Sequence, residues 1–247
     1  MTGSRAAPHD FPMSPEPAGR IVARELVAMA AAALLYPIGL LPSRGRTPRR
    51  AEQRTAVLVH GYLGNRSSLL PLWGYLRVRG VKQILAYEYT GAPGIEQAAI
   101  GLRDFLRRRV RGGRIDLVCH SLGGLVARVY LQQLGGARRV DRCITLGTPH
   151  LGTYNAYWLA SRVGRELRPD SALLARLSAS RGRAGNVDFA SIVAGSDNLV
   201  VPRVFAADED VVHIPGLGHV GLLFSPTVFR AVAERLRRPA GTRATVS

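Results

Sequence analysis

The fold of this chain is constrained most by the stretch Leu117-Val118-Cys119-His120-Ser121-Leu122-Gly123-Gly124. An apolar run that begins at Ile115 ends abruptly at a serine, and a helical pattern follows at once. This pattern predicts a strand, a sharp turn and a helix, with the Ser121 hydroxyl at the apex. The residues two before and two after such a serine must be small, because the strand and helix backbones nearly touch there. Gly123 meets this condition, and Cys119, which stands where glycine is usual, is also small.

Short apolar strands alternate with helical patterns through most of the chain. Continuous hydrophobic strands between helices predict an α/β fold in which a mostly parallel sheet of about six strands is covered by helices on both faces. In such sheets ligands bind at the carboxyl ends of the strands. The strands are predicted at 56–59, 83–89, 115–119, 142–146, 189–194 and 211–214, and the helices at 69–79, 95–110, 122–134 and 220–238.

A serine at a strand-to-helix turn becomes a nucleophile only if a base and an acid accompany it. Asp197 stands at the tip of a turn after one predicted strand, and His219 lies in a glycine-rich loop after the last one. The order serine, acid, histidine is the one this strand-turn-helix motif favours. Asp208 and Asp210 are alternative acids, although their acidic cluster is more typical of a solvated turn.

Acyl transfer also needs two N–H donors aimed at the developing oxyanion. The first candidate is the backbone N–H of Leu122, at the start of the predicted helix. The second is the backbone N–H of Tyr62, in the loop after the first core strand, where Gly61 lets the backbone turn.

The remaining histidines have other predicted places. His60 is expected to support the Tyr62 loop, and His120 is expected to be fixed by the turn and to point away from the serine. His150 is a candidate to line the site, and His213 is expected to pack within a strand. His9 belongs to the leader.

Four sequence blocks together resemble the small bacterial lipases of the α/β-hydrolase fold. The resemblance covers about residues 55–238, and it implies an α/β-hydrolase fold, hydrolysis through Ser121, Asp197 and His219, and no cofactor. Two features depart from that family: Cys119 in place of glycine, and an apolar N-terminal extension, which puts the secreted location of these lipases in doubt. The blocks are Val59-His60-Gly61-Tyr62-Leu63-Gly64, Cys119-His120-Ser121-Leu122-Gly123-Gly124, Leu146-Gly147-Thr148-Pro149-His150-Leu151-Gly152 and Gly218-His219-Val220-Gly221-Leu222-Leu223-Phe224-Ser225.

The sequence divides into a disordered leader (1–20), an apolar segment with a basic linker (21–50) and a catalytic domain (51–247). The apolar run from Leu26 to Leu41 has 16 residues, fewer than the roughly 20 of a membrane-spanning helix. It is compatible with a signal-peptide core, a short membrane anchor, or an apolar helix on the domain or on a bilayer surface. Membrane association is favoured, while a secreted or cytoplasmic location stays open.

An insertion at about 151–185 is expected to select the substrate. Tyr154 and Trp158 belong to an apolar, aromatic segment, and Leu173, Leu174 and Leu177 recur at helical spacing. The insertion is either a cap or acyl-binding wall that meets lipid, or a set of core-facing helices. With His150, Tyr154 and Trp158 are the candidate substrate-binding residues.

The formal net charge is +17, and Lys82 is the single lysine among the basic residues. Such a charge attracts anionic surfaces, although a coding bias towards arginine is the favoured explanation. Zinc spacing, a basic helix and interleaved aromatic and basic residues are all missing, so nucleic acid is not a predicted partner. Cys119 and Cys143 lie in apolar runs and are expected to be buried free thiols.

These patterns predict a serine hydrolase that cleaves carboxylic esters through an acyl-enzyme, with acylglycerols or other lipid esters as favoured substrates. Two alternatives remain: an acyltransferase that uses the same intermediate, and a non-catalytic, membrane-associated binding protein on the same fold. The sequence does not indicate an oligomeric state.

Overall fold

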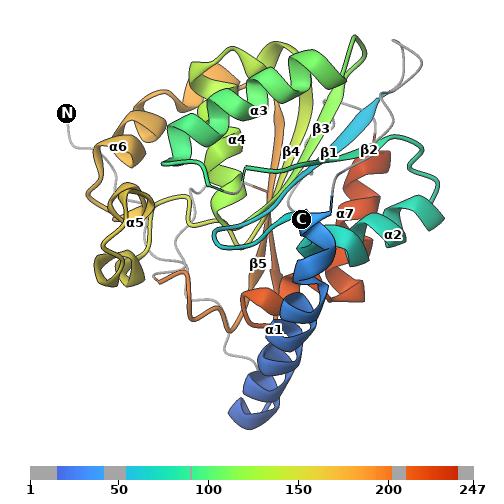
Figure 1. The fold of residues 1–247 in the computed structure, drawn as a ribbon, viewed down its shortest axis with the longest axis vertical. Coiled ribbons are helices and arrows are strands. Elements are labelled where there is room, and N and C mark those ends of the chain that lie inside the picture. Colours follow the sequence, from blue (N-terminus) through green and yellow to red (C-terminus); the bar gives the residue numbers. More distant parts are fainter. Residues whose placement is uncertain (1–15, 42–53, 90, 202–209, 239–247) are drawn as a thin grey trace.

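The computed structural model describes residues 16–41, 54–89, 91–201 and 210–238. Its centre is one six-stranded sheet in the order β2-β1-β3-β4-β5-β6, and every neighbouring pair is parallel (Figure 1). This confirms the predicted parallel α/β architecture. The strands are β1 (Thr55–Val59), β2 (Ile84–Tyr87), β3 (Ile115–His120), β4 (Val140–Leu146), β5 (Asp188–Ala194) and β6 (Asp210–Ile214).

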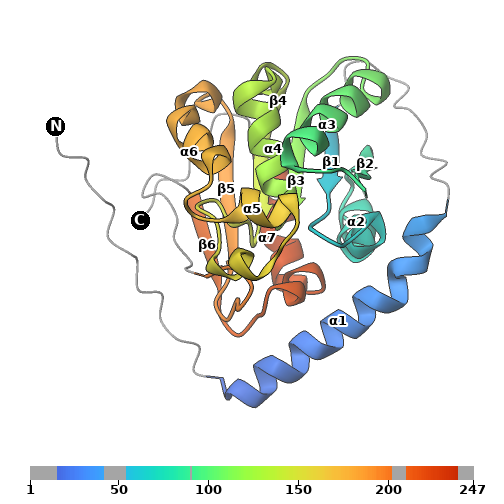
Figure 2. The same cartoon turned by 60° about the vertical axis from the view of Figure 1, so that its left-hand side comes forward.

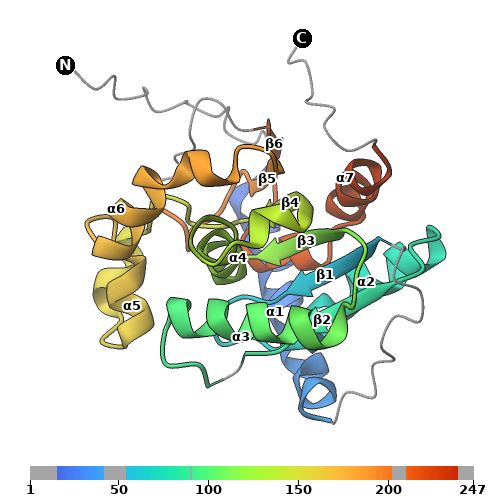
Figure 3. The ribbon, with the colours of Figure 1, turned by 90° about the horizontal axis from the view of Figure 1, so that it is seen from above.

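The sheet is covered by helices on both faces, as Figure 3 shows along the strands. Helices α3 (Ile95–Arg109) and α4 (Leu122–Gln133) pack on one face, and α2 (Leu70–Val78) and α7 (Pro226–Arg237) pack on the other. Every residue of β1, β3 and β4 is buried, which explains why their apolar residues do not alternate with exposed polar ones. The charged side chains of Asp116 on β3 and Arg142 on β4 are buried as an ion pair at 3.0 Å.

The chain leaves β1 for β2 on one side and returns to β3 on the other side of β1. The loops after β1 and β3 therefore diverge at the switch point of the sheet, where α/β proteins bind ligands. Ser121 directly follows β3, and the Tyr62 loop directly follows β1. The loops with Asp197 and His219 follow β5 and β6 at the same edge.

The insertion between β4 and β5 forms two short helices, α5 (Arg162–Leu167) and α6 (Ala172–Ala179). Leu173, Leu174 and Leu177 are buried in the core beside α3 and α4. For these leucines the core-facing interpretation holds. Cys119 and Cys143 are buried free thiols, as predicted.

Two predicted boundaries are corrected. The helix expected at 220–238 is a 3₁₀ turn (Val220–Leu223) followed by a separate α7, because the Ser225 side chain accepts a hydrogen bond from the Val228 N–H and Pro226 begins the helix. The N-terminal apolar run belongs to a longer helix, α1 (Ala18–Leu40), which starts inside the predicted leader. The rest of the leader (1–15) and most of the basic linker lie outside the described residues.

Helix α1 lies across the carboxyl edge of the sheet, and Figure 2 shows it running diagonally past the ends of α2 and α7. It contacts the 3₁₀ segment after β1 (Arg66–Leu69) and the 3₁₀ turn after β6. Helix α1, which precedes β1 in the chain, thus borders the edge that carries the candidate site.

Candidate active site

The turn between β3 and α4 has the strained geometry that the sequence predicts. Ser121 has φ 51° and ψ −123°, and Leu122 begins the helix. Among the described residues, only Ser121 and Leu63 combine a positive φ with a side chain larger than that of glycine. Such a conformation persists only where the surrounding structure imposes it. Here the parallel sheet and α4 fix both ends of the turn.

Close packing of the backbone leaves no space for side chains at two glycines. A Cβ at Gly123 would lie 2.6 Å from the carbonyl oxygen of His60 and 2.8 Å from that of Val59. A Cβ at Gly61 would lie 3.0 Å from Cβ of Ser121. The loop after β1 is therefore pressed against the serine turn.

Asp197 and His219 meet at the carboxyl edge of the sheet. Nδ1 of His219 lies 2.7 Å from Oδ2 of Asp197, and both side chains are buried. The other carboxylate oxygen accepts the backbone N–H groups of Leu199 (2.8 Å) and Val200 (2.9 Å). An Nδ1–H held by a carboxylate leaves Nε2 of the neutral imidazole free to accept a proton.

The charge of Asp197 is stabilised by its partners. Burial raises the pKa of Asp197, but the hydrogen bond and charge of His219 and the N–H groups of Val200 and Leu199 outweigh this and keep the pKa below its ordinary value. A carboxylate that stays ionised at neutral pH can orient an imidazole and stabilise its protonated form.

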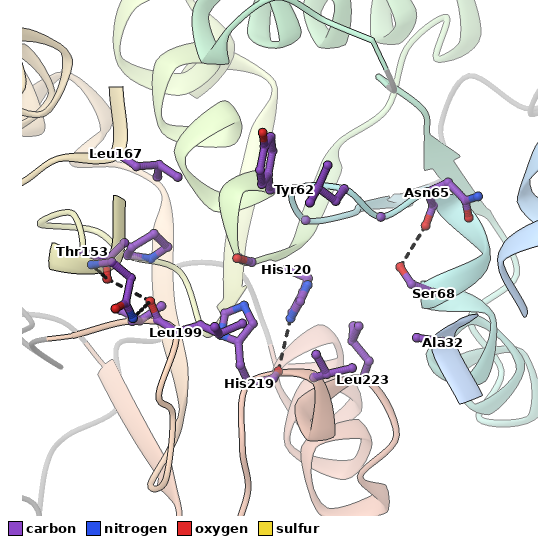
Figure 4. A pocket seen from close by; sticks show the side chains of 18 of the residues that line it. Ala32, Tyr62, Asn65, Ser68, His120, Thr153, Leu167, Leu199, His219 and Leu223 are labelled. Carbon is purple, nitrogen blue, oxygen red and sulfur yellow. Dashed lines mark hydrogen bonds between the residues drawn. The ribbon is translucent and has the colours of Figure 1, made fainter. Parts of the chain in front are cut away.

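Ser121 and His219 line one pocket of about 530 Å³. Figure 4 shows His219 and His120 close together near the centre of the view, with Leu199 and Leu223 on either side and Leu167 farther away. The lining is mostly apolar and comes from the loop after β1, the insertion, the histidine loop and α1, which contributes Ala32, Ala33 and Tyr36. The volume falls in the range of about 300–1,000 Å³ that is typical of small-molecule sites.

Two backbone N–H groups are available at the serine. Leu122 is the first residue of α4, so its N–H has no partner within the helix. Tyr62 follows Gly61 in the loop that packs on Ser121. Within the described residues, neither N–H donates a hydrogen bond. Both N–H groups are therefore available to a ligand, as the predicted oxyanion hole requires.

The candidate substrate-binding residues lie around the pocket rather than in its lining. His150 is buried, with Nε2 3.0 Å from Oγ1 of Thr145, and burial and the charge of Arg128 hold its pKa well below the ordinary value. Tyr154 and Trp158 are 58 % and 89 % exposed. The insertion reaches the pocket instead through Asn155, Ala156, Leu159 and Leu167.

His120 lines the pocket, which corrects the expectation that it points away from the serine. Its ring centroid lies 4.9 Å from that of His219, and Nε2 is 3.4 Å from the carbonyl oxygen of His219. Burial, with the positive charge of His219, lowers the pKa of His120 to about 3. His120 is therefore uncharged near neutral pH. Its position directly before the serine places it in the turn, but the sequence does not indicate the direction of its ring.

The remaining candidates have structural roles. His60 contacts Oε1 of Glu88 through Nε2 (2.7 Å) and stacks on Tyr89, which fits its predicted support of the loop. Asp210 pairs with Arg235 on α7 at 2.7 Å. Asp208 lies outside the described residues.

Comparison with known proteins shows similarity to one family and to several solved structures. Residues 95–182 match the palmitoyl protein thioesterase family, a segment that includes Ser121 but ends before Asp197 and His219. The structure is similar to Aspergillus fumigatus lipase B, with a TM-score of 0.67 and 14 % identity over 81 % of this chain. It is similar to the mature form of the Bacillus licheniformis lipase BlEst2, with a TM-score of 0.63 and 15 % identity. The chain has the α/β-hydrolase fold.

The extent of these similarities differs. This chain covers 56 % of the Aspergillus lipase. The match to BlEst2 takes in 78 % of this chain and 95 % of that one. A protein from Listeria innocua is matched over 97 % of its length, with a TM-score of 0.56 and 15 % identity. Because all three identities are low, the shared feature is the fold.

Proposed function

We propose that this protein is a serine hydrolase that cleaves carboxylic esters of apolar acyl chains, with acylglycerols or similar lipid esters as its substrates. One observation carries the proposal: a strained Ser121 and an Asp197–His219 pair at 2.7 Å open into the same apolar pocket. The similarity to lipases, and the match to a thioesterase family, support hydrolysis of an acyl bond.

In the first half of the reaction, Oγ of Ser121 attacks the ester carbonyl carbon while Nε2 of His219 takes the hydroxyl proton. Asp197 holds Nδ1–H of the imidazole and stabilises its positive charge. The N–H groups of Leu122 and Tyr62 stabilise the oxyanion of the tetrahedral intermediate. His219 then gives the proton to the leaving alcohol, and the acyl group stays on Ser121.

In the second half, His219 takes a proton from water, and the resulting hydroxide attacks the acyl-enzyme. The second tetrahedral intermediate uses the same two N–H groups. Its collapse releases the carboxylic acid and returns the proton to Ser121. An alcohol that replaces water in this step would make the protein an acyltransferase.

The pocket sets the substrate class. Most of its lining surface is apolar and includes leucine, valine and alanine side chains, although asparagine, serine and threonine residues also line it. Each methylene that leaves water for such a surface contributes about 0.8 kcal/mol, or roughly fourfold in kcat/KM if the contact is made in the transition state. We therefore expect kcat/KM to rise with acyl-chain length until the pocket is filled.

An acyl thioester is the second candidate substrate, and the match of residues 95–182 to the palmitoyl protein thioesterase family favours it. The same groups serve both reactions, because a thioester differs only in its leaving group. Parallel assays with p-nitrophenyl octanoate and an octanoyl thioester distinguish the two.

The proposal is tested on the purified full chain with p-nitrophenyl butyrate and octanoate and with a fluorophosphonate probe. Ser121→Ala should abolish both hydrolysis and labelling without changing the melting temperature by more than a few degrees. Ser178→Ala, which alters an exposed serine on α6, is the matched control and should retain full activity. Wild-type turnover by the Ser121 variant would refute the assignment, and an unreactive wild-type protein would favour a binding function.

A further inference from the structure

Helix α1 carries a large apolar surface that the described part of the chain leaves exposed. Among the described residues it is the one helix long and apolar enough to cross a membrane, by length and composition alone. Exposed apolar patches of this size mark sites of contact with a partner or a membrane. The exposed side chains include Val22 (54 %), Leu26 (60 %), Val27 (70 %), Met29 (52 %), Leu34 (81 %), Ile38 (46 %) and Leu40 (67 %).

The opposite face of α1 is fastened to the loop of the catalytic histidine. The Glu25 carboxylate accepts hydrogen bonds from the backbone N–H groups of Val220 (2.6 Å) and Gly221 (2.9 Å). These are the two residues that follow His219 in its loop. A Cβ at Gly218 would overlap the Glu25 side chain. Glu25 thus contacts the chain on both sides of His219.

A second attachment lies near the other end of α1. Nδ2 of Asn65 donates to the carbonyl oxygen of Tyr36 at 2.9 Å, and the side chain of Arg66 donates to the carbonyl oxygen of Leu41. Gly39 lies so close to Asn65 that a Cβ there would overlap it. Between the two attachments, Ala32, Ala33 and Tyr36 line the pocket.

The attachments decide how α1 can meet a bilayer. Glu25 and Tyr36 are 11 residues apart in sequence, or about 16 Å along a helix axis. If α1 crossed a hydrocarbon core of about 30 Å, both attachment points, with the polar loops that they hold, would lie inside it. A helix lying in the plane of the interface keeps those loops in water while its outer face enters the lipid.

Other residues that line the pocket are also apolar and exposed. Leu63 and Leu199 line the pocket and are 78 % and 53 % exposed. In Figure 4, α1 and the segment with Leu199 flank the pocket from opposite sides. Arg20 lies in the first turn of α1, while Arg24 in the next turn pairs with Glu16 at 2.6 Å. The chain carries a net charge of +17, which favours an anionic surface.

We propose that α1 binds the surface of an anionic lipid bilayer with its outer face, and with its inner face forms the wall of the pocket along which an acyl chain enters from the bilayer. Glu25 is the positioning residue that fastens this lipid-bound helix to the histidine loop. The proposal rests on the proposed function for the identity of the acyl chain, but the membrane contact is measured independently of turnover.

The membrane contact is tested by co-sedimentation of the full chain with vesicles of phosphatidylcholine and phosphatidylglycerol. Val27→Asp with Leu34→Asp places charges on the outer face and should weaken vesicle binding at least tenfold, while hydrolysis of soluble p-nitrophenyl butyrate stays within twofold. Val78→Asp, at an 87 % exposed valine on α2, is the matched control and should bind as wild type does. Vesicle binding by the double variant equal to that of wild type would overturn the proposal. A wild-type protein that forms a dimer and does not bind vesicles would also overturn it.

The role of Glu25 is tested separately. Glu25→Ala should lower kcat for the soluble ester at least tenfold with little change in KM, while vesicle binding is retained. Glu25→Gln, whose side-chain oxygen can still accept a hydrogen bond, should recover part of kcat. Glu234→Gln, on the exposed side of α7, should change neither. A wild-type kcat in Glu25→Ala would refute the positioning role. Loss of activity in Ser121→Ala tests only the proposed hydrolysis, so the two proposals can fail independently.

Discussion

Replacing Gly123 with alanine tests whether the approach of β1 to the serine turn creates the catalytic geometry. The new Cβ would lie 2.6 Å from the carbonyl oxygen of His60, whereas ordinary contacts begin at 3.4 Å. The two backbones must therefore separate by about 0.8 Å, and a misplacement of this order costs roughly 100-fold in rate. The Tyr62 N–H and Ser121 lie on the two segments that move apart, so the loss should fall on the oxyanion hole.

The assay measures kcat for p-nitrophenyl butyrate, with fluorophosphonate labelling and thermal melting on the same samples. We expect kcat to fall about 100-fold, equivalent to about 2.7 kcal/mol of transition-state stabilisation, in a protein that still melts cooperatively. Gly74→Ala is the matched control, because nothing lies within 4 Å of a Cβ at that helical position. It should leave kcat unchanged and raise the free energy of unfolding by about 0.5–1 kcal/mol. A Gly123→Ala variant with kcat within threefold of wild type would refute the reasoning.

Two further predictions concern the groups around the serine. Asp197→Asn should lower kcat by about 10³–10⁴-fold at unchanged fold, because an amide cannot hold the required imidazole tautomer; a loss below tenfold in the ester assay would contradict this. Lowering the pH from 6.5 towards 5 should reduce the free energy of unfolding. His120, with a pKa of about 3 in the folded protein, takes up a proton in this range only when the chain unfolds. In urea titrations, His120→Gln should therefore reduce the pH dependence of the free energy of unfolding by about 1.4 kcal/mol per pH unit. If the free energy of unfolding changed equally with pH in the two proteins, a buried neutral imidazole would be refuted.

Much of the architecture follows from local sequence patterns. Apolar runs such as Thr55–Val59 are continuous because the strands are buried on both faces. The residues that follow successive strands must then meet at one edge of a parallel sheet. This rule brings Ser121, Asp197 and His219 to one edge without any knowledge of their distances. The contact between Asp197 and His219 at 2.7 Å joins residues that are 22 positions apart but come after neighbouring strands.

Other features depend on packing between distant segments and leave little trace in the sequence. Glu25 accepts hydrogen bonds from peptide groups 195 and 196 residues away, and backbone N–H groups carry no residue-specific signal. The apolar run that contains Ala32 predicts a helix but not the surface on which it docks. His150 follows a strand, as the site residues do, yet its ring turns into the interior towards Thr145. The position of a residue after a strand predicts the edge of the sheet at which it lies, whereas the direction of its side chain depends on local packing.

The positions two residues before and two residues after Ser121 have different surroundings, which explains how Cys119 is accepted. Gly123 faces the backbone of β1, where a methyl group would meet two carbonyl oxygens that cannot move independently of the sheet. The Cys119 side chain instead lies in the core on the side of α3 and α4, near Cys143. Burial, with the neighbouring Cys143, raises the pKa of the Cys119 thiol well above its ordinary value, so it remains protonated and packs as a small apolar group. The motif therefore requires glycine where backbone meets backbone, and only modest size where a side chain meets the core.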